Sequence, residues 1–228
     1  MKNYLLSALL FLVASFSVSC VATRNQVDFG VKSLGYEESV SYSVTALSPI
    51  KNKKMHVGEG MAVVVAMLGD KCILATAKHV VQNAESILIA PLDGRLNNRA
   101  KIEAKVVYTD GLEDVAFLSF ATNYNHIAPK VILDEAILIG KSVIAFKYPS
   151  DYGYQIARGQ IFDFWRLPDN KEVMVARMST GKGFSGSGVF DANGNLAGLV
   201  SGKAADKRVD VAYLISGPRI AAAFQRFL

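Results

Sequence analysis

The stretch GKGFSGSGVFDANGNLAG, residues 181–198, places Ser185 in a glycine-rich segment and follows it with an apolar run. Glycine permits tight turns and lets backbone N–H groups face an open space. The simplest interpretation of this stretch is a hairpin loop. The alternative is a nucleophilic serine in a turn whose N–H groups bind an oxyanion, which requires a histidine and a carboxylate elsewhere in the chain.

The composition is that of a globular protein, because 51% of the 228 residues are hydrophobic and only 20% are charged. The length suits one all-β domain or two smaller domains. The net charge is +5, but the basic residues from Arg95 to Lys105 are interleaved with Glu103, which favours a solvated face. We therefore expect no nucleic-acid partner, and we expect neither a metal site nor a cofactor.

Residues 1–19, MKNYLLSALLFLVASFSVS, have a basic start and an apolar run too short to span a membrane. This pattern predicts a secretory signal and an exported protein of the periplasm or cell envelope. Cys20 stands where a bacterial lipoprotein signal places its lipidated cysteine, and Val21 after it favours the outer membrane. We expect a lipid anchor on Cys20, and ordinary cleavage after Ser19 or Ala22 is the alternative.

Residues 20–38 show no sustained period and predict a linker or N-terminal arm, whereas residues 39–228 predict the folded domain. Short apolar runs separated by turn clusters predict about a dozen strands, and such a series is typical of a β-sandwich or of β-barrels. The predicted strands are 39–47, 61–68, 72–76, 86–91, 102–108, 115–120, 142–146, 154–164, 172–178, 187–190, 196–201 and 209–215.

The last segment, SGPRIAAAFQRFL, predicts a helix. Ser216 is placed to cap it, and the proline that follows suits a first helical turn. Ile220, Phe224, Phe227 and Leu228 then fall on one face at helical spacing. We expect a chain of strands closed by one amphipathic helix.

Of the three histidines, only His79 lies where an apolar strand runs into a small-residue turn, in CILATAKHVV. His56 and His126 are interpreted as structural. Asp114 directly precedes another apolar strand, where a carboxylate needs a hydrogen-bond partner such as an imidazole N–H. Asp110 and Glu113 are alternative acids in the same turn.

His79, Asp114 and Ser185 follow one another in one of the known chain orders of the serine triad. A serine hydroxyl becomes a useful nucleophile when an imidazole takes its proton, and a carboxylate holds the imidazole in the required tautomer. Backbone N–H groups of Gly183 and Ser185 are the candidate oxyanion hole, and each such donor contributes about 3–4 kcal/mol.

The chain resembles trypsin-like (chymotrypsin-fold) serine proteases of the bacterial HtrA and V8-like kind. The resemblance covers Val57 to Leu228 and rests on three motifs in family order: GEGMAVVVAMLGDKCILATAKHVV, DVAFLSF and GFSGSGVFDANGNLAGLVSG. It implies two six-stranded antiparallel β-barrels and a serine endopeptidase that cleaves polypeptides through an acyl-enzyme. The chain departs from the family at Phe184, Gly188 and Lys78, and none of these removes a catalytic atom.

The resemblance also implies a substrate pocket formed by Ser179, Thr180, Val200 and Val211. These residues carry no charge, so we expect cleavage after small or medium apolar residues and not after Arg, Lys or Glu. A catalytically silent binding module with the same fold is the alternative function. An α/β-hydrolase esterase is excluded, because its G-x-S-x-G elbow requires the order Ser, Asp, His.

Overall fold

The computed structural model describes residues 37, 39–50, 53–92, 101–148, 155–204 and 210–228. The predicted signal sequence, Cys20 and nearly all of the predicted N-terminal arm lie outside the described residues. None of the helices in the described part of the chain has the length and apolar character needed to cross a bilayer.

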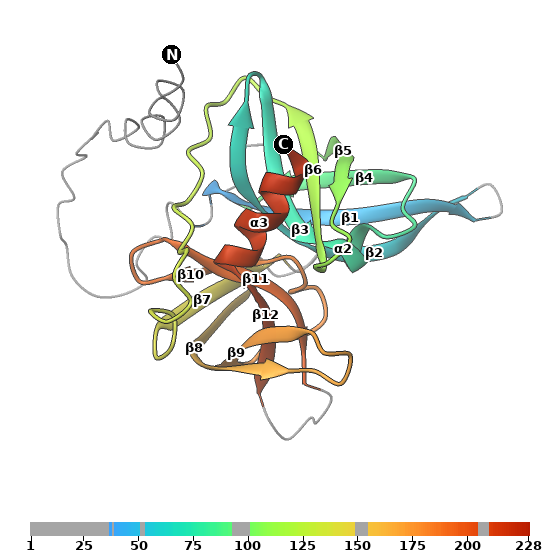
Figure 1. The fold of residues 1–228 in the computed structure, drawn as a ribbon. Helices are drawn as coiled ribbons and strands as arrows, with labels where there is room; N and C mark the ends of the chain where they lie inside the picture. The colour runs from blue at the N-terminus through green and yellow to red at the C-terminus, as the bar shows by residue number, and fades with distance from the viewer. Residues whose placement is uncertain (1–36, 38, 51–52, 93–100, 149–154, 205–209) are drawn as a thin grey trace, which may run out of the picture. The chain divides into compact units, whose positions relative to one another are not determined.

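Twelve strands form two closed antiparallel barrels, with the strand orders β1-β2-β3-β6-β5-β4 and β10-β11-β12-β9-β8-β7. Figure 1 shows the first barrel in blue to green and the second in yellow to orange. The predicted all-β class with two six-stranded barrels is confirmed. The strands are β1 (Ser41–Ile50), β2 (Lys53–Leu68), β3 (Lys71–Ala77), β4 (Ser86–Pro91), β5 (Ile102–Thr109), β6 (Val115–Ala121), β7 (Ser142–Lys147), β8 (Gln155–Arg166), β9 (Glu172–Met178), β10 (Gly188–Asp191), β11 (Leu196–Lys203) and β12 (Val211–Ser216).

Two neighbouring strands of the first barrel, β3 and β6, are buried on both faces. All residues of β3 after Lys71, and all residues of β6 before Ala121, are buried. Side chains of the second barrel and of the C-terminal helix, including Phe146, Leu199 and Ile220, belong to the same apolar cluster as this barrel's interior. Such strands are continuously apolar because neither face meets water.

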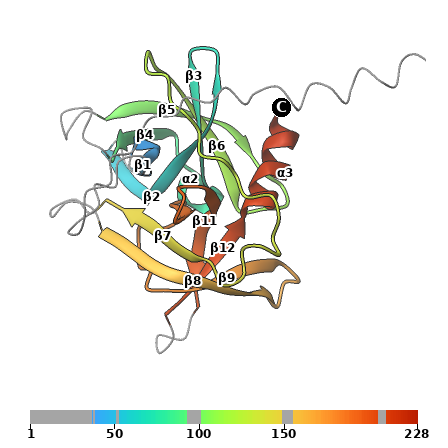
Figure 2. The same cartoon turned by 90° about the vertical axis from the view of Figure 1, so that its left-hand side faces the viewer.

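Helix α2 (Lys78–Val81) follows β3 directly, and helix α3 (Gly217–Phe227) follows β12, the last strand of the second barrel. Figure 2 shows α3 along one side of the two barrels. Two expectations about α3 were wrong. Ser216 makes no side-chain cap, because its hydroxyl donates to the carboxylate of Glu135 instead, and Leu228 lies beyond the helix with 75% of its surface exposed.

Candidate active site

His79 lies on α2, at the end of the buried strand β3, and its side chain is 45% exposed. Its ring Nδ1 is 2.7 Å from Oδ2 of Asp114, and its backbone N–H donates to Oδ1 of the same carboxylate over 3.0 Å. Both carboxylate oxygens therefore face one residue. With Nδ1–H donating to Asp114, the Nε2 atom of the neutral ring keeps its lone pair for accepting a proton.

Asp114 is also held by the second barrel, because the hydroxyl of Ser201 on β11 donates to its Oδ2 atom over 2.7 Å. Ser201 follows Val200, a predicted pocket residue, but its role was not recognised from the sequence. The pattern LAGLVSG marks a strand end and carries no sign of a partner 87 residues away.

These contacts perturb both titratable groups. The hydrogen bond to Asp114, together with the charge of that carboxylate, raises the pKa of His79, although burial opposes this shift. Burial alone would raise the pKa of Asp114, but hydrogen bonds from His79 and Ser201 and the nearby imidazole lower it. The pair therefore favours an ionised carboxylate beside an imidazole that readily takes a proton.

Ser185 lies in the glycine-rich turn between β9 and β10. The backbone of this turn makes hydrogen bonds to both barrels. The carbonyl oxygen of Ser185 accepts from Met61 N over 2.8 Å, and Gly186 N donates to Val200 O over 2.7 Å. Gly186 has φ +81°, and a Cβ there would lie 2.1 Å from Met61 O and 2.4 Å from Thr76 Oγ1. Only glycine allows this close approach of the turn to the first barrel.

The same approach brings the Ser185 turn to the segment that carries His79. A Cβ at Gly60 would lie 2.4 Å from Ser185 O and 2.8 Å from Cγ2 of Val80, so Ser185 and α2 flank the same glycine. Among the described residues, no hydrogen bond joins the Ser185 hydroxyl to His79. Catalytic hydrogen bonds of unliganded enzymes are often long and tighten when substrate binds.

The predicted oxyanion hole would consist of two backbone N–H groups, those of Gly183 and Ser185. Gly183 has φ +88°, a conformation that favours glycine. In the described part of the chain, neither Gly183 N–H nor Ser185 N–H donates to another protein group. The side chain of Lys147 lies beside this turn, with its Cε 2.9 Å from the position of a Cβ on Gly183.

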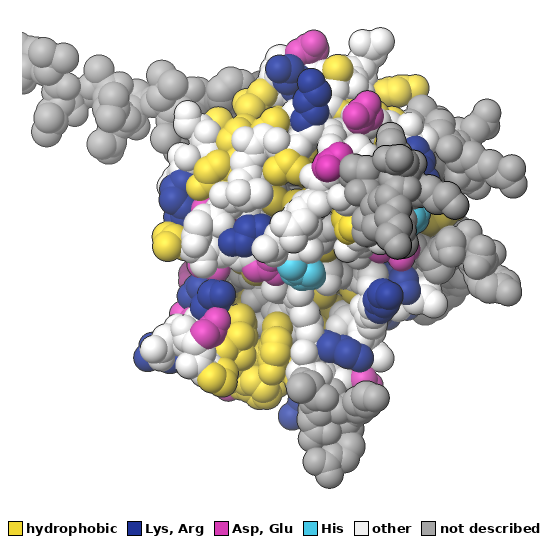
Figure 3. Space-filling model, turned by 90° about the vertical axis from the view of Figure 1, so that its right-hand side faces the viewer, with side chains coloured by type: hydrophobic (Ala, Val, Ile, Leu, Met, Phe, Trp, Pro, Cys, Tyr) yellow, Lys and Arg dark blue, Asp and Glu magenta, His cyan; other side chains and the backbone are white. Residues whose placement is uncertain are grey.

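The four predicted pocket residues lie in different surroundings. Ser179 is exposed and Thr180 half-buried after β9, whereas Val200 belongs to the interior of the second barrel. Val211 packs in a separate apolar cluster with Val175, Ala204 and the half-buried Phe162, Val173 and Tyr213. Figure 3 shows hydrophobic side chains gathered on the lower part of one face, in the barrel that contains β8 and β9.

The other two histidines lie outside this arrangement. His126 is buried, with its Nε2 atom 3.2 Å from the hydroxyl of Tyr42, and His56 is exposed on β2. Within the described ranges, no group of three or more His, Cys, Asp or Glu side chains is placed to hold a metal ion.

A family model described as a trypsin-like peptidase domain matches residues 60–199, which is more than half of the chain. The chain therefore belongs to the trypsin-like peptidase family. The matched range contains His79, Asp114 and Ser185.

Individual proteins of the same kind are similar to this chain. The periplasmic serine endoprotease DegP of Escherichia coli K12 is 29% identical over 153 residues, which cover 65% of this chain and 30% of DegP. A probable periplasmic serine endoprotease, DegP-like, of Pseudomonas putida W619 is 30% identical over 129 residues, which cover 55% of this chain and 26% of that protein. The chain thus spans less than a third of the length of these curated relatives.

Solved structures show the same fold. The active form of the Rv3671c protease from M. tuberculosis matches with a TM-score of 0.66 and 24% identity, over 84% of this chain and 82% of that one. The inactive form of that protease matches with a TM-score of 0.63 and 23% identity, over 84% of this chain and 90% of that one.

Proposed function

We propose that this protein is a serine endopeptidase with His79 as general base, Asp114 as the residue that orients it, and Ser185 as nucleophile. The observation that carries the proposal is the bidentate contact of Asp114 with His79, at the seam where the Ser185 turn is bound to β2. Membership of the trypsin-like peptidase family and the similarity to serine endoproteases support it.

In this mechanism the Ser185 hydroxyl attacks the scissile carbonyl carbon while its proton moves to Nε2 of His79. The oxyanion accepts hydrogen bonds from the N–H groups of Gly183 and Ser185, each contributing about 3–4 kcal/mol to the transition state. His79 then gives its proton to the leaving amine, which breaks the peptide bond and leaves an acyl-Ser185 ester. Water, deprotonated by His79, hydrolyses the ester and restores the serine.

The test is covalent labelling of the protein with a fluorophosphonate, followed by mass spectrometry to locate the adduct. We expect labelling at Ser185 in the wild type and none in Ser185→Ala. Wild-type protein that is folded by circular dichroism but never labels would favour a binding module instead.

The primary specificity is proposed from the resemblance, which assigns four uncharged residues to the pocket. Ser179 is exposed and Thr180 is half-buried, whereas Val200 and Val211 are buried in separate apolar clusters. An unpaired Arg, Lys or Glu side chain in such a pocket would lose its hydration without gaining a partner. The proposed enzyme therefore cleaves after small or medium apolar residues such as Val, Ala or Leu. Cleavage-site profiling in a proteome-derived peptide library checks this, and a dominant Arg, Lys or Glu before the scissile bond contradicts it.

The proposed location is the periplasmic side of the cell envelope, with the chain anchored through a lipid on Cys20. The signal-like residues 1–19 and the periplasmic relatives support export. Fractionation of cells that express the wild type and Cys20→Ala tests the anchor. The wild type should sediment with membranes and the variant should be soluble, whereas a soluble wild type that begins at Ala22 or Thr23 rejects the lipid.

A further inference from the structure

The turn between β5 and β6, residues 110–114, ends at Asp114 and is shaped by Asp110. The side chain of Asp110 has no exposed surface, and its Oδ1 accepts from the backbone N–H groups of Leu112 over 2.8 Å and Glu113 over 2.7 Å. Its own N–H donates to Val115 O over 2.9 Å. One buried carboxylate thus determines the path of the backbone that leads to Asp114.

Groups outside the turn hold Asp110 in place. Its Oδ2 accepts from Nε of Arg226 on α3 over 2.8 Å and from the hydroxyl of Tyr108 over 3.1 Å. Its carbonyl oxygen accepts from Nζ of Lys78, the residue before His79, over 2.7 Å. Burial would raise the pKa of Asp110, but the bonds from Arg226, the turn amides and Tyr108 lower it well below its usual range.

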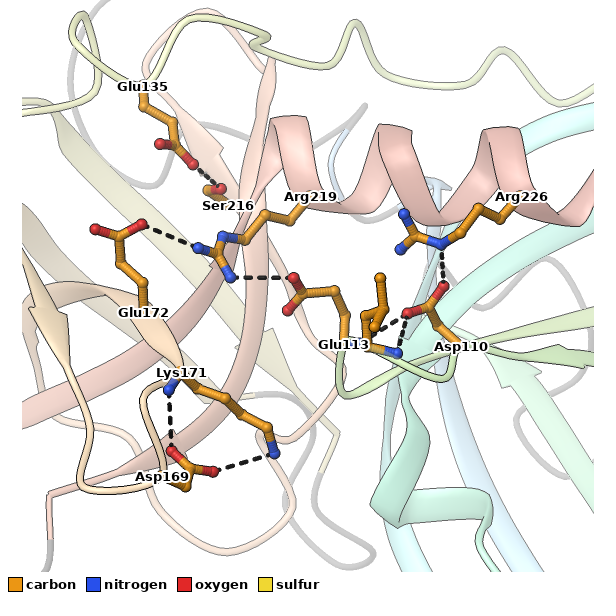
Figure 4. A network of polar contacts seen from close by, with 10 residues as sticks. Asp110, Glu113, Glu135, Asp169, Lys171, Glu172, Ser216, Arg219 and Arg226 are labelled. Atoms are coloured by element: carbon orange, nitrogen blue, oxygen red, sulfur yellow. Dashed lines mark hydrogen bonds and ion pairs between the residues drawn. The ribbon is translucent and has the colours of Figure 1, made fainter.

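A second arginine of α3 holds the same turn. Nη1 of Arg219 is 3.0 Å from Oε1 of Glu113, and its Nη2 is 3.0 Å from Oε2 of Glu172, the first residue of β9. Figure 4 shows Arg219 between these two carboxylates and Arg226 over Asp110. The guanidinium therefore links the turn of the first barrel to a strand of the second.

The helix that carries both arginines is itself firmly seated. Phe224 meets Phe117 of β6 edge-on at 5.3 Å between ring centroids, and Phe227 lies 5.9 Å from the ring of Tyr108. At the start of α3, the hydroxyl of Ser216 donates to Glu135. Because the helix is packed in this way, its two guanidinium groups hold the turn in one position.

We propose that α3 positions the triad carboxylate, with Arg226 and Arg219 holding residues 110–114 so that both oxygens of Asp114 face His79. The inference rests on the proposed peptidase function. Neither arginine contacts a reacting group of the triad, so both are positioning residues. They act through the Asp110 and Glu113 side chains on the backbone of the turn.

The first test compares Arg226→Ala with the wild type, after the active sites of each are counted by fluorophosphonate titration. A small displacement of a catalytic group lowers the rate about 100-fold, so we expect that loss in kcat per titrated site, with KM little changed. Arg226→Lys, which keeps the charge, should recover part of the rate. A purely structural role would reduce the number of titratable sites and leave kcat per site unchanged, which would overturn the proposal.

Two controls separate positioning from general effects. Gln225→Ala changes the exposed neighbour of Arg226 on the same helix, and Arg166→Ala removes an exposed arginine of β8. Both should retain the wild-type kcat per site. Arg219→Ala should reduce kcat in the same way as Arg226→Ala.

The second test does not depend on catalysis: the pKa of the His79 ring is measured by NMR titration. Removing a cation by itself raises the pKa of a nearby histidine, whereas loosening of Asp114 lowers it. We expect Arg226→Ala to lower the pKa of His79 towards its ordinary value of 6.5, and the control Gln225→Ala to leave it unchanged. An unchanged or raised value overturns the positioning role. The positioning role and the peptidase function can therefore fail separately, because the titration requires no catalytic activity.

Discussion

The His79–Asp114 pair belongs to the first barrel and is held by side-chain hydrogen bonds, whereas the Ser185 turn belongs to the second barrel and is held by its backbone. Asp114 receives bonds from His79 and Ser201, while the Ser185 hydroxyl has no hydrogen bond within the described residues. The proposed base and its carboxylate are thus oriented without a bound substrate. Within the described residues, the proposed nucleophile is positioned by the backbone of its turn and not by a side-chain hydrogen bond.

The largest expected loss of activity follows from a change in the Ser185 turn, which is held by its backbone. Ser185→Ala should reduce kcat by about a millionfold, because loss of the nucleophile removes the acyl-enzyme route. The fold should persist, since the removed hydroxyl makes no bond in the described part of the chain. Peptide hydrolysis and thermal unfolding measured on the same preparation check both statements, and appreciable remaining activity would exclude Ser185 as nucleophile.

In the His79–Asp114 pair, Asp114→Asn should lower kcat by about 10⁴-fold, because the imidazole is then held in the wrong tautomer. The wild-type rate should rise with pH as His79 loses its proton, with a midpoint above 6.5, since Asp114 raises the pKa of His79. Loss of the carboxylate charge should move this midpoint to lower pH. A pH profile of kcat/KM for both proteins measures the shift, and an identical midpoint in both would contradict the pairing.

Gly183→Ala tests whether the backbone of the turn supplies the oxyanion hole. A Cβ is strained at φ +88° and would lie 2.9 Å from Cε of Lys147, so the Gly183 N–H should turn away. Loss of one such donor lowers kcat by about 10²–10³-fold. Gly181→Ala is the matched control, because a Cβ there meets nothing within 4 Å. Equal activity of the two variants would argue against this role of Gly183.

The smallest effect is expected for Ser201→Ala, which removes the bond that the second barrel makes to Asp114. A hydrogen bond to a charged group contributes about 1.5–3 kcal/mol, so kcat should fall by about 10- to 160-fold at most. Ser201→Thr retains a hydroxyl and should recover much of the rate. Steady-state kinetics of the three proteins decide this, and a fall as large as that of Asp114→Asn would mean that Ser201 does more than support the carboxylate.

The positions of most strands could be predicted because they are marked by local patterns, whereas the two six-stranded barrels were implied only by the resemblance to trypsin-like proteases. The predicted bounds of 86–91 and 172–178 coincide with β4 and β9. The start of β2 was missed by eight residues, since Lys53–Gly60 lacks an apolar alternation. This segment is a strand because it pairs with β1, from Ile50 opposite Lys53 to Val44 opposite Gly60.

The sequence by itself determined the class of the fold, the order of the three candidate catalytic residues and the position of Ser185 in a glycine-rich turn. The strands and the glycine-rich turn depend on residues close together in the chain, whereas the order of the three candidate residues was recognised because it matches a known order of the serine triad. Only the tertiary structure decided that Ser201 binds Asp114 and that Arg226 holds Asp110, 116 residues away. Such contacts leave no local pattern, because closure of the barrels and the seating of α3, not neighbouring residues, bring their partners together.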